Sequence, residues 1–287
     1  MMRGPAIVAR SLSVATTGGS GKSVFQHGNA WQYHSRSDRH SKIACWALMF
    51  DLLRSSELLR SHLESGKVAA GINHEMRDFA HNRAKNLDLV VCRALGEPSK
   101  RTFADLVGAY AIQLDDDDRR ELERLPVAPL AKPATVLMAL EAKACMTEFG
   151  KARPRLYDEL NSSHLTIHGD TDGAIAAGFL LLNVAETFVS PIRNPWKLGE
   201  LPTRVSQHNQ PRDAKLVAEK VAELPRRSRQ GDEGFDAFAI LAIDLANDGR
   251  KVTLVPEAVG RIYPPIFDYA AAVDRLAHIY ATRFSSI

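Results

Sequence analysis

Apolar residues along the chain gather into helical and strand-like segments. The longest helical segment is predicted over residues 41–66, where Ser41 supplies an N-cap and Gly66 a C-terminal stop. Its first half, residues 43–50, is apolar on every face, and a helix that is apolar all round is buried in a protein core. The pattern therefore predicts a long central helix.

Short apolar runs separated by polar turns follow this helix and predict a β-sheet. Strands are expected at 67–73, 87–94 and 133–144. The third run is apolar on both faces over 136–140, which is typical of a central strand covered on both sides. Residues 174–191 predict one more buried strand, and their length leaves a helix open as the alternative.

The excursion at 95–132 contains a helical stretch near 102–114 and four consecutive aspartates at 115–118. Aspartates at the start of a helix cap and solvate it, and this interpretation is favoured over a divalent metal site. Pro154 is expected to open the next helix, because proline suits the first helical turn.

The C-terminal third begins with four prolines within 191–212, which predict a long loop or linker. A helix is expected at 212–224, a β-hairpin around residues 247–249 (Asn-Asp-Gly), and a closing helix at 265–284.

The pattern predicts an α/β fold with a C-terminal hairpin and helix extension. Residues 1–40, rich in Gly, Ser, Thr and basic side chains, are expected to form an arm with one strand near 29–34. The core is placed at 41–190, with 95–132 as an insertion, and an extension at 191–287 serves recognition or dimerisation.

Composition narrows the class of protein but does not name a partner. Of the 287 residues, 37 are Lys or Arg and 34 are Asp or Glu. The resulting net charge of +3 does not by itself indicate a polyanionic binding partner. Cys45, Cys92 and Cys145 each lie in an apolar run, which indicates reduced core thiols of a cytoplasmic protein. No apolar run approaches the roughly 18 residues that span a bilayer. Arg10 interrupts the apolar part of the N-terminal region, which argues against a secretory signal peptide. A transit peptide is left as an alternative.

Charged residues interrupt two of the apolar strands. Glu141 and Lys143 alternate with apolar neighbours, so both side chains point to one side of the third strand. Asp88 is a lone acid inside the second strand. Burying such charges without partners costs several kcal/mol, so each needs a counterion, a metal or a water-filled cleft.

If the second and third strands are neighbours, Asp88 and Glu141 can converge on one divalent cation, with the backbone carbonyl of Ala142 between them. Mg²⁺ suits this set, because it takes one or two carboxylates and completes its shell with waters and phosphate oxygens. Metal-bound water is a stronger nucleophile, and Lys143 would orient it or stabilise developing charge. The chemistry implied is phosphodiester hydrolysis.

An Asp in one strand followed by (Asp/Glu)-x-Lys at the end of another, here Asp88 and Glu141-Ala142-Lys143, resembles the PD-(D/E)xK nuclease superfamily, which includes most type II restriction endonucleases. The similarity covers roughly residues 41–190. It implies a mixed sheet flanked by helices, Mg²⁺-dependent cleavage of double-stranded DNA, Asp88 and Glu141 as metal ligands, Lys143 as catalytic lysine, and a homodimer. The competing interpretation is structural: Glu141 and Lys143 form a salt bridge and Asp88 caps a turn.

Several residues are candidates for supporting roles around this site. Glu75 is a candidate accessory acid. Basic side chains at the start of the helix after the third strand, and in the polar cluster before the long helix, are candidate DNA contacts. These residues are Lys151, Arg153, Arg155, Arg36 and Arg39.

Residues 16–23 (TTGGSGKS) approach a phosphate-binding loop that would use Lys22, but Thr16 stands where the motif requires glycine. The flanking residues also make a poor strand and a poor helix. Nucleotide binding through Lys22 is therefore the alternative function, beside a non-catalytic DNA-binding module.

Overall fold

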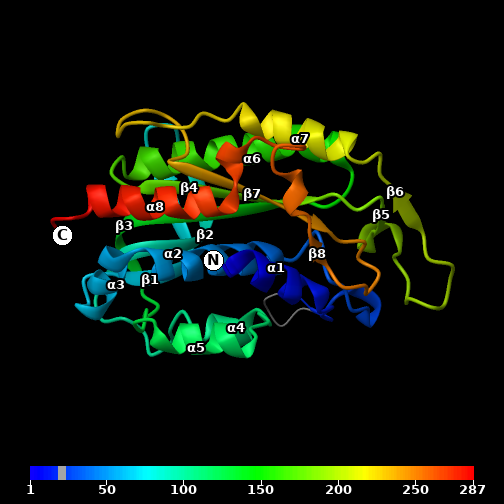
Figure 1. Cartoon of the computed structure of the whole chain (residues 1–287), viewed down its shortest axis with the longest axis horizontal. Helices are drawn as coiled ribbons and strands as arrows, with labels where there is room; N and C mark the ends of the chain where they lie inside the picture. The colour runs from blue at the N-terminus through cyan, green and yellow to red at the C-terminus, as the bar shows by residue number, and fades with distance from the viewer. Residues whose placement is uncertain (19–23) are drawn as a thin grey trace.

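A six-stranded mixed sheet in the order β1-β2-β3-β4-β7-β8 forms the centre of the computed structural model, which describes residues 1–18 and 24–287 (Figure 1). The pairs β1–β2 and β2–β3 are antiparallel, the pairs β3–β4 and β4–β7 are parallel, and β8 pairs antiparallel with β7. β5 and β6 form a separate two-stranded sheet. The strands are β1 (Ala69–Asp78), β2 (Arg83–Ala94), β3 (Pro133–Cys145), β4 (Ile175–Asn183), β5 (Thr187–Val189), β6 (Val205–Gln207), β7 (Ala237–Asp244) and β8 (Thr253–Leu254).

Helices cover both faces of the sheet and bury a hydrophobic core on each side (Figure 1). One face is covered by α1 (Gly4–Ser13), α2 (Arg39–Ser55), α3 (Glu57–Glu64) and α8 (Tyr269–Arg283). The other face carries α6 (Phe149–Asp170) and α7 (Arg212–Ala222). The remaining helical elements are α4 (Leu106–Ala109), α5 (Asp116–Arg124), and the 3-10 turns Gln26–Gly28, Pro191–Arg193, Pro256–Ala258 and Pro265–Phe267.

The expected sheet is confirmed in its coarse form. The three strands expected before residue 145 are β1 to β3, and the run at 174–191 forms β4 and β5, so its helical alternative is wrong. The C-terminal hairpin is β7 with β8, and the two expected C-terminal helices are α7 and α8. The three cysteines are buried and unbonded to one another. The sheet continues past the boundary predicted at 190, because β7 pairs with β4.

Two helix predictions were wrong. The helix expected over 41–66 is interrupted at Ser56, whose extended backbone ends α2 and whose Oγ accepts a hydrogen bond from the Leu59 N–H to cap α3 (3.3 Å). α2 also begins before Ser41, at Arg39. Pro154 lies inside α6 instead of opening it, since Glu148 already accepts the first backbone hydrogen bonds of that helix.

The expected N-terminal arm is instead part of the core. Ile7, Val8 and Leu12 of α1 are completely buried against α2. The strand expected at 29–34 is not formed, since Trp31 makes only an isolated bridge with Thr16. The sequence prediction failed because basic residues on the outer face of α1 hid its apolar stripe. Those basic residues have specific acidic partners.

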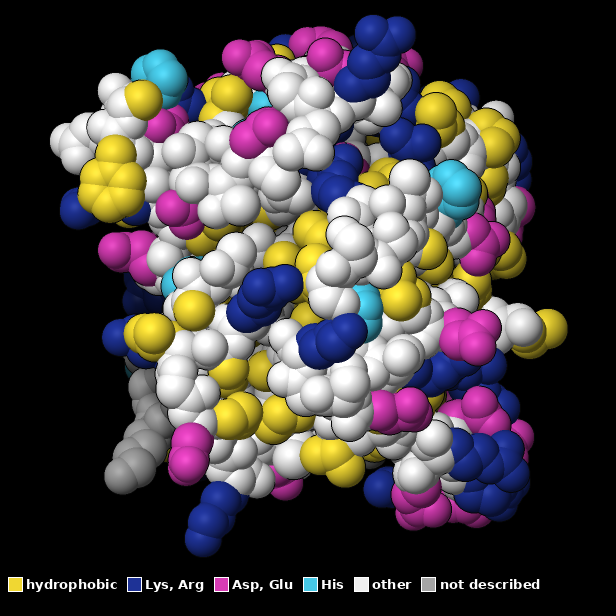
Figure 2. Space-filling model, turned by 90° about the vertical axis from the view of Figure 1, so that its left-hand side faces the viewer, with side chains coloured by type: hydrophobic (Ala, Val, Ile, Leu, Met, Phe, Trp, Pro, Cys, Tyr) yellow, Lys and Arg dark blue, Asp and Glu magenta, His cyan; other side chains and the backbone are white. Residues whose placement is uncertain are grey.

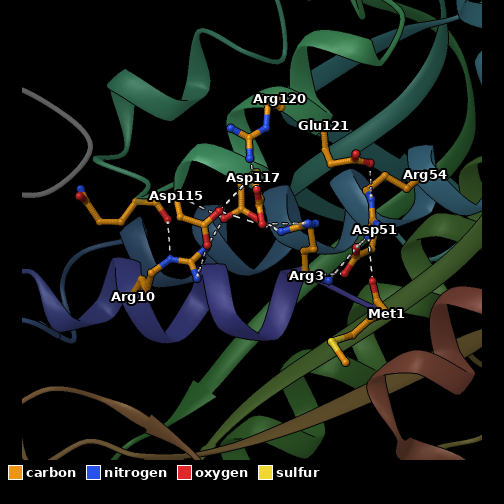
Figure 3. Close-up of polar contacts among 12 residues, drawn as sticks. Met1, Arg3, Arg10, Asp51, Arg54, Asp115, Asp117, Arg120 and Glu121 are labelled. Carbon is orange, nitrogen blue, oxygen red and sulfur yellow. Dashed lines mark hydrogen bonds and ion pairs between the residues drawn. The ribbon is translucent and has the colours of Figure 1, made fainter.

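Arg3, just before α1, and Arg10 of α1 project toward the acidic start of α5, and Arg54 of α2 pairs with Asp51 and Glu121 (Figure 3). Asp118 accepts from both Arg3 and Arg10, and it also completes a capping box with Asp115. The favoured capping interpretation of the four aspartates is therefore confirmed. They also anchor the chain start to the insertion.

The end of the molecule that lies to the left in Figure 1, carrying α3 and the C-terminus, shows no extended surface of one charge sign. Lys and Arg side chains are interspersed there with Asp, Glu and apolar groups (Figure 2). Within the described residues, no helix is long and apolar enough to cross a membrane.

Close packing between β4 and β7 generates a stability prediction. A Cβ added at Gly178 would lie 2.3 Å from Phe238 Cδ2, far inside van der Waals contact. We expect Gly178→Ala to lower the free energy of unfolding by about 1–3 kcal/mol. Gly108→Ala in α4, where a Cβ meets nothing within 4 Å, is the matched control and should change it by no more than about 1 kcal/mol. Equal urea midpoints for the two variants would contradict this packing.

Candidate active site

The charged strand residues meet where two strands lie side by side. β2 and β3 are antiparallel neighbours with Leu89 opposite Leu140. The next residues along the two strands, Asp88 and Glu141, therefore lie side by side. Across the parallel pair, Glu141 lies opposite Gly178, the fourth of the nine residues of β4, so the site lies part-way along the parallel strands.

Asp88 is held by donors from two elements. The Lys42 ammonium lies 2.7 Å from Asp88 Oδ1, and the Ser41 hydroxyl donates to the same oxygen at 3.0 Å. The Ala142 N–H donates to Asp88 Oδ2 at 3.0 Å. Ser41 and Lys42 lie in the first turn of α2, where the helix dipole also favours a carboxylate. The Asp88 carboxylate therefore has one fixed orientation.

Glu141 has fewer hydrogen-bond and ion-pair partners than the other carboxylates of the site. Only 2% of its surface is exposed, Oε1 lies 2.8 Å from Lys143 Nζ, and Oε2 has no hydrogen-bond partner. Burial and then the neighbouring Asp88 carboxylate raise the pKa of Glu141 to about 7, against the opposing effect of Lys143. Its charge is therefore costly unless a further cation is present.

Lys143 connects the buried carboxylate to solvent. Its ammonium reaches Glu159 Oε2 of α6 at 3.6 Å, and Arg155 pairs with the other oxygen of Glu159 at 3.2 Å. About a quarter of the Lys143 side chain is exposed, whereas most of Arg155 is. The carboxylates Glu141 and Glu159 outweigh burial and raise the pKa of Lys143, which keeps the ammonium charged.

Four side chains that complete the site were missed by the sequence analysis: His40, Ser41, Lys42 and Glu159. Lys42 stands at the start of an apolar helix, and a lysine there is a signal for a buried counterion. Glu159 falls between Leu156 and Leu160 on the buried stripe of α6, which also departs from the apolar pattern. Burial lowers the pKa of His40 to about 4, so its imidazole is neutral beside Asp88 and Lys143.

The residues present fit one divalent cation for which the protein supplies only part of the coordination shell. Two carboxylates of adjacent strands, one of them with an orphaned buried oxygen, meet the one or two carboxylates that Mg²⁺ uses. The contact made by Ala142 is through its N–H, not through the carbonyl proposed as a ligand. Among the described residues no group of three or more His, Cys, Asp or Glu is arranged to hold a metal. The other ligands would have to be water and substrate oxygens.

The basic residues expected to contact DNA separate into two groups. Lys151 and Arg155 are exposed on the first turns of α6, Arg153 is half-buried, and Arg36 is exposed. Arg39 is instead an interior residue, 5% exposed, that donates to the carbonyls of Ser11 and Tyr110 and so ties α1 and α4 to α2. With its guanidinium used in this way, Arg39 does not fit the expected role in DNA contact.

Two further candidates lie outside this cluster. Glu75 is exposed on β1 opposite Asn86, and in the described part of the chain no hydrogen bond or ion pair joins it to Asp88 or Glu141. Lys22 lies outside the described residues. The elements flanking its segment are α1 and a 3-10 turn at 26–28, not the strand and helix that a phosphate-binding loop requires.

Comparison with known proteins adds no relative. No protein-family model, no curated protein and no solved structure matches this chain. The chemistry of the site therefore has to be argued from its own geometry.

The cost of ionising Glu141 generates a pH prediction. Below pH 4.5 the carboxyl is protonated whether the chain is folded or unfolded, but ionisation near pH 7 is penalised in the folded state alone. In EDTA, we expect Glu141→Gln to leave stability unchanged at low pH and to raise the free energy of unfolding by about 3 kcal/mol at pH 8.

Urea titrations across this pH range check the prediction. The exposed Glu148→Gln variant is the control, because its side chain is 56% exposed and should add no such pH dependence. A constant difference between Glu141→Gln and the native chain from low to high pH would contradict the raised pKa.

Proposed function

We propose that this protein is a Mg²⁺-dependent endonuclease that hydrolyses phosphodiester bonds of double-stranded DNA, built on a PD-(D/E)xK-like core. The observation that carries the proposal is the orphaned, buried Oε2 of Glu141 beside Asp88, with Lys143 on the same strand. The mixed sheet with helices on both faces supports it.

A purely structural role for the three charges explains less. A salt bridge between Glu141 and Lys143 satisfies one oxygen of Glu141 but leaves the other buried without a partner. Two carboxylates placed side by side on neighbouring buried strands also destabilise each other. A protein that keeps this arrangement gains nothing in stability from it, which is typical of a site that binds a cation.

The roles of the side chains follow from their contacts. Asp88, fixed by Lys42, Ser41 and the Ala142 N–H, and Glu141 would hold the Mg²⁺. The bound cation would lower the pKa of a coordinated water and offset the negative charge that develops at phosphorus. Lys143 would donate a hydrogen bond to the attacking water or to a phosphate oxygen. Glu159 holds the Lys143 ammonium from the α6 side.

The exposed cations at the start of α6 would guide the DNA backbone to this site. Lys151 and Arg155 lie on the first turns of α6, and a helix N-terminus adds a favourable field for phosphate. Cleavage of both strands calls for two copies of the site, so we infer a homodimer on DNA. A type II restriction enzyme, with sequence-specific cleavage, is the finer form of this proposal.

DNA cleavage tests the proposal directly. Purified protein incubated with unmethylated phage DNA should give Mg²⁺-dependent fragments that EDTA prevents. Glu141→Ala and Lys143→Ala should each lower the cleavage rate at least about 100-fold, because each removes a group that acts on the reacting phosphate.

The ion pair Lys220–Glu223 at the C-terminal end of α7 supplies matched controls, and Lys220→Ala and Glu223→Ala should cut at the native rate. Cleavage retained by both Glu141→Ala and Lys143→Ala would overturn the proposal. DNA binding without metal-dependent cutting by the native chain would favour the non-catalytic DNA-binding module.

A further inference from the structure

A cavity of about 640 Å³ lies between two segments that are far apart in sequence, residues 24–36 and 191–195. Asn29 joins the two walls: its Nδ2 donates to the Trp196 carbonyl at 2.8 Å, and its Oδ1 accepts from the Leu198 N–H at 2.9 Å. The volume falls within the roughly 300–1,000 Å³ of ligand pockets. The pocket is therefore preformed and large enough for a small molecule or part of a polymer.

The side chains that line this pocket combine flat rings with positive charge. Phe25 and His34 stack with ring centroids 4.4 Å apart and planes 9° from parallel, and Trp31 lies beside them. Arg36 is exposed at the pocket and, among the described lining residues, none is Asp or Glu. Aromatic faces beside an arginine are the combination that binds the bases and phosphates of a nucleic-acid strand.

A second cavity of similar volume shows that this chemistry is not general to the surface. It measures about 600 Å³ and is lined by Arg261 but also by Glu186 and Glu257. Those acids would repel phosphate. The absence of acids from the described lining of the first pocket therefore gives it a charge complementary to DNA.

A series of contacts leads from the first pocket toward the candidate active site. Tyr33, between its lining residues, donates its N–H to Asn247 just beyond β7, and its ring contacts Phe188 of β5. A narrow cavity lined by Phe25, Trp31 and His34 also borders His40. His40 precedes Ser41, which binds Asp88. Residues 25–40 therefore connect the pocket to the helix start that holds Asp88.

We propose that this pocket binds an unpaired nucleotide of the DNA strand that is cut at Glu141. Its base packs against the Phe25–His34 pair, and Arg36 contacts its phosphate. The inference rests on the proposed function and names a feature of the substrate: a single-stranded tail or extruded base next to the cleaved bond. Base stacking of this kind requires an unpaired base, because bases inside a duplex are already stacked.

Binding to two labelled probes tests the inference. One probe is a fluorescein-labelled duplex of mixed sequence, and the other is the same duplex with a single-stranded oligothymidine tail. Fluorescence anisotropy is measured in Mg²⁺ with the Glu141→Gln chain, so that the probe stays intact. The tail should lower the Kd at least about fivefold.

Variants at the pocket should abolish the effect of the tail. On the Glu141→Gln background, Phe25→Ala and Phe25→Leu should bring the tailed probe to the Kd of the blunt one. Phe25→Leu keeps an apolar side chain but removes the aromatic face, and a urea midpoint equal to that of the Glu141→Gln chain controls for folding. Arg36→Ala should weaken binding of the tailed probe. It should also reduce the slope of log Kd against log salt concentration by about one, because one phosphate contact is lost. Arg261→Ala is the matched control and should retain the full preference.

The possible failures are distinguishable. A native chain that cuts DNA, with no preference for the tail or with a preference that survives all three pocket variants, would overturn the pocket inference alone. A native chain that neither cuts nor binds either probe would overturn the proposed function with it.

Discussion

The burial of two carboxylates on neighbouring strands is the constraint around which the candidate site is organised. Asp88 has three donors, from α2 and from β3, whereas Glu141 has one lysine and one oxygen without a partner. Such an uneven distribution of partners indicates that one positive charge or donor is still to be added. A divalent cation with open coordination positions answers that need, and phosphate oxygens complete its shell.

The rest of the fold holds these groups in place from two faces. α2 brings Lys42 and Ser41 to Asp88 because its first half is buried on every side, so the helix start cannot move away from the sheet. α6 brings Glu159 to Lys143 from the opposite face. Arg39, which was expected to contact DNA, holds the start of α2 by donating to carbonyls of neighbouring segments. The precision of the site therefore depends on helix packing rather than on loops.

The sequence was sufficient for the sheet and for the clustering of Asp88, Glu141 and Lys143, because strand periodicity and charged interruptions are local signals. It was not sufficient for α1, whose buried stripe was obscured by Arg3 and Arg10, since their partners Asp115 and Asp118 are distant in sequence (Figure 3). The break at Ser56 was missed because a serine that ends one helix and caps the next looks like an ordinary helix residue. Lys42 and Glu159 became part of the site only through tertiary contacts.

The binding of Mn²⁺ in place of Mg²⁺, followed by electron paramagnetic resonance without DNA, tests the central claim most directly. Since Asp88 and Glu141 are argued to share one cation, the native chain should bind Mn²⁺ at a site that Asp88→Asn and Glu141→Gln each abolish. Glu223→Gln, at the ion pair with Lys220 at the C-terminal end of α7, should bind it as the native chain does. Equal Mn²⁺ binding by all four chains, or none by the native chain, would contradict a cation site at these carboxylates.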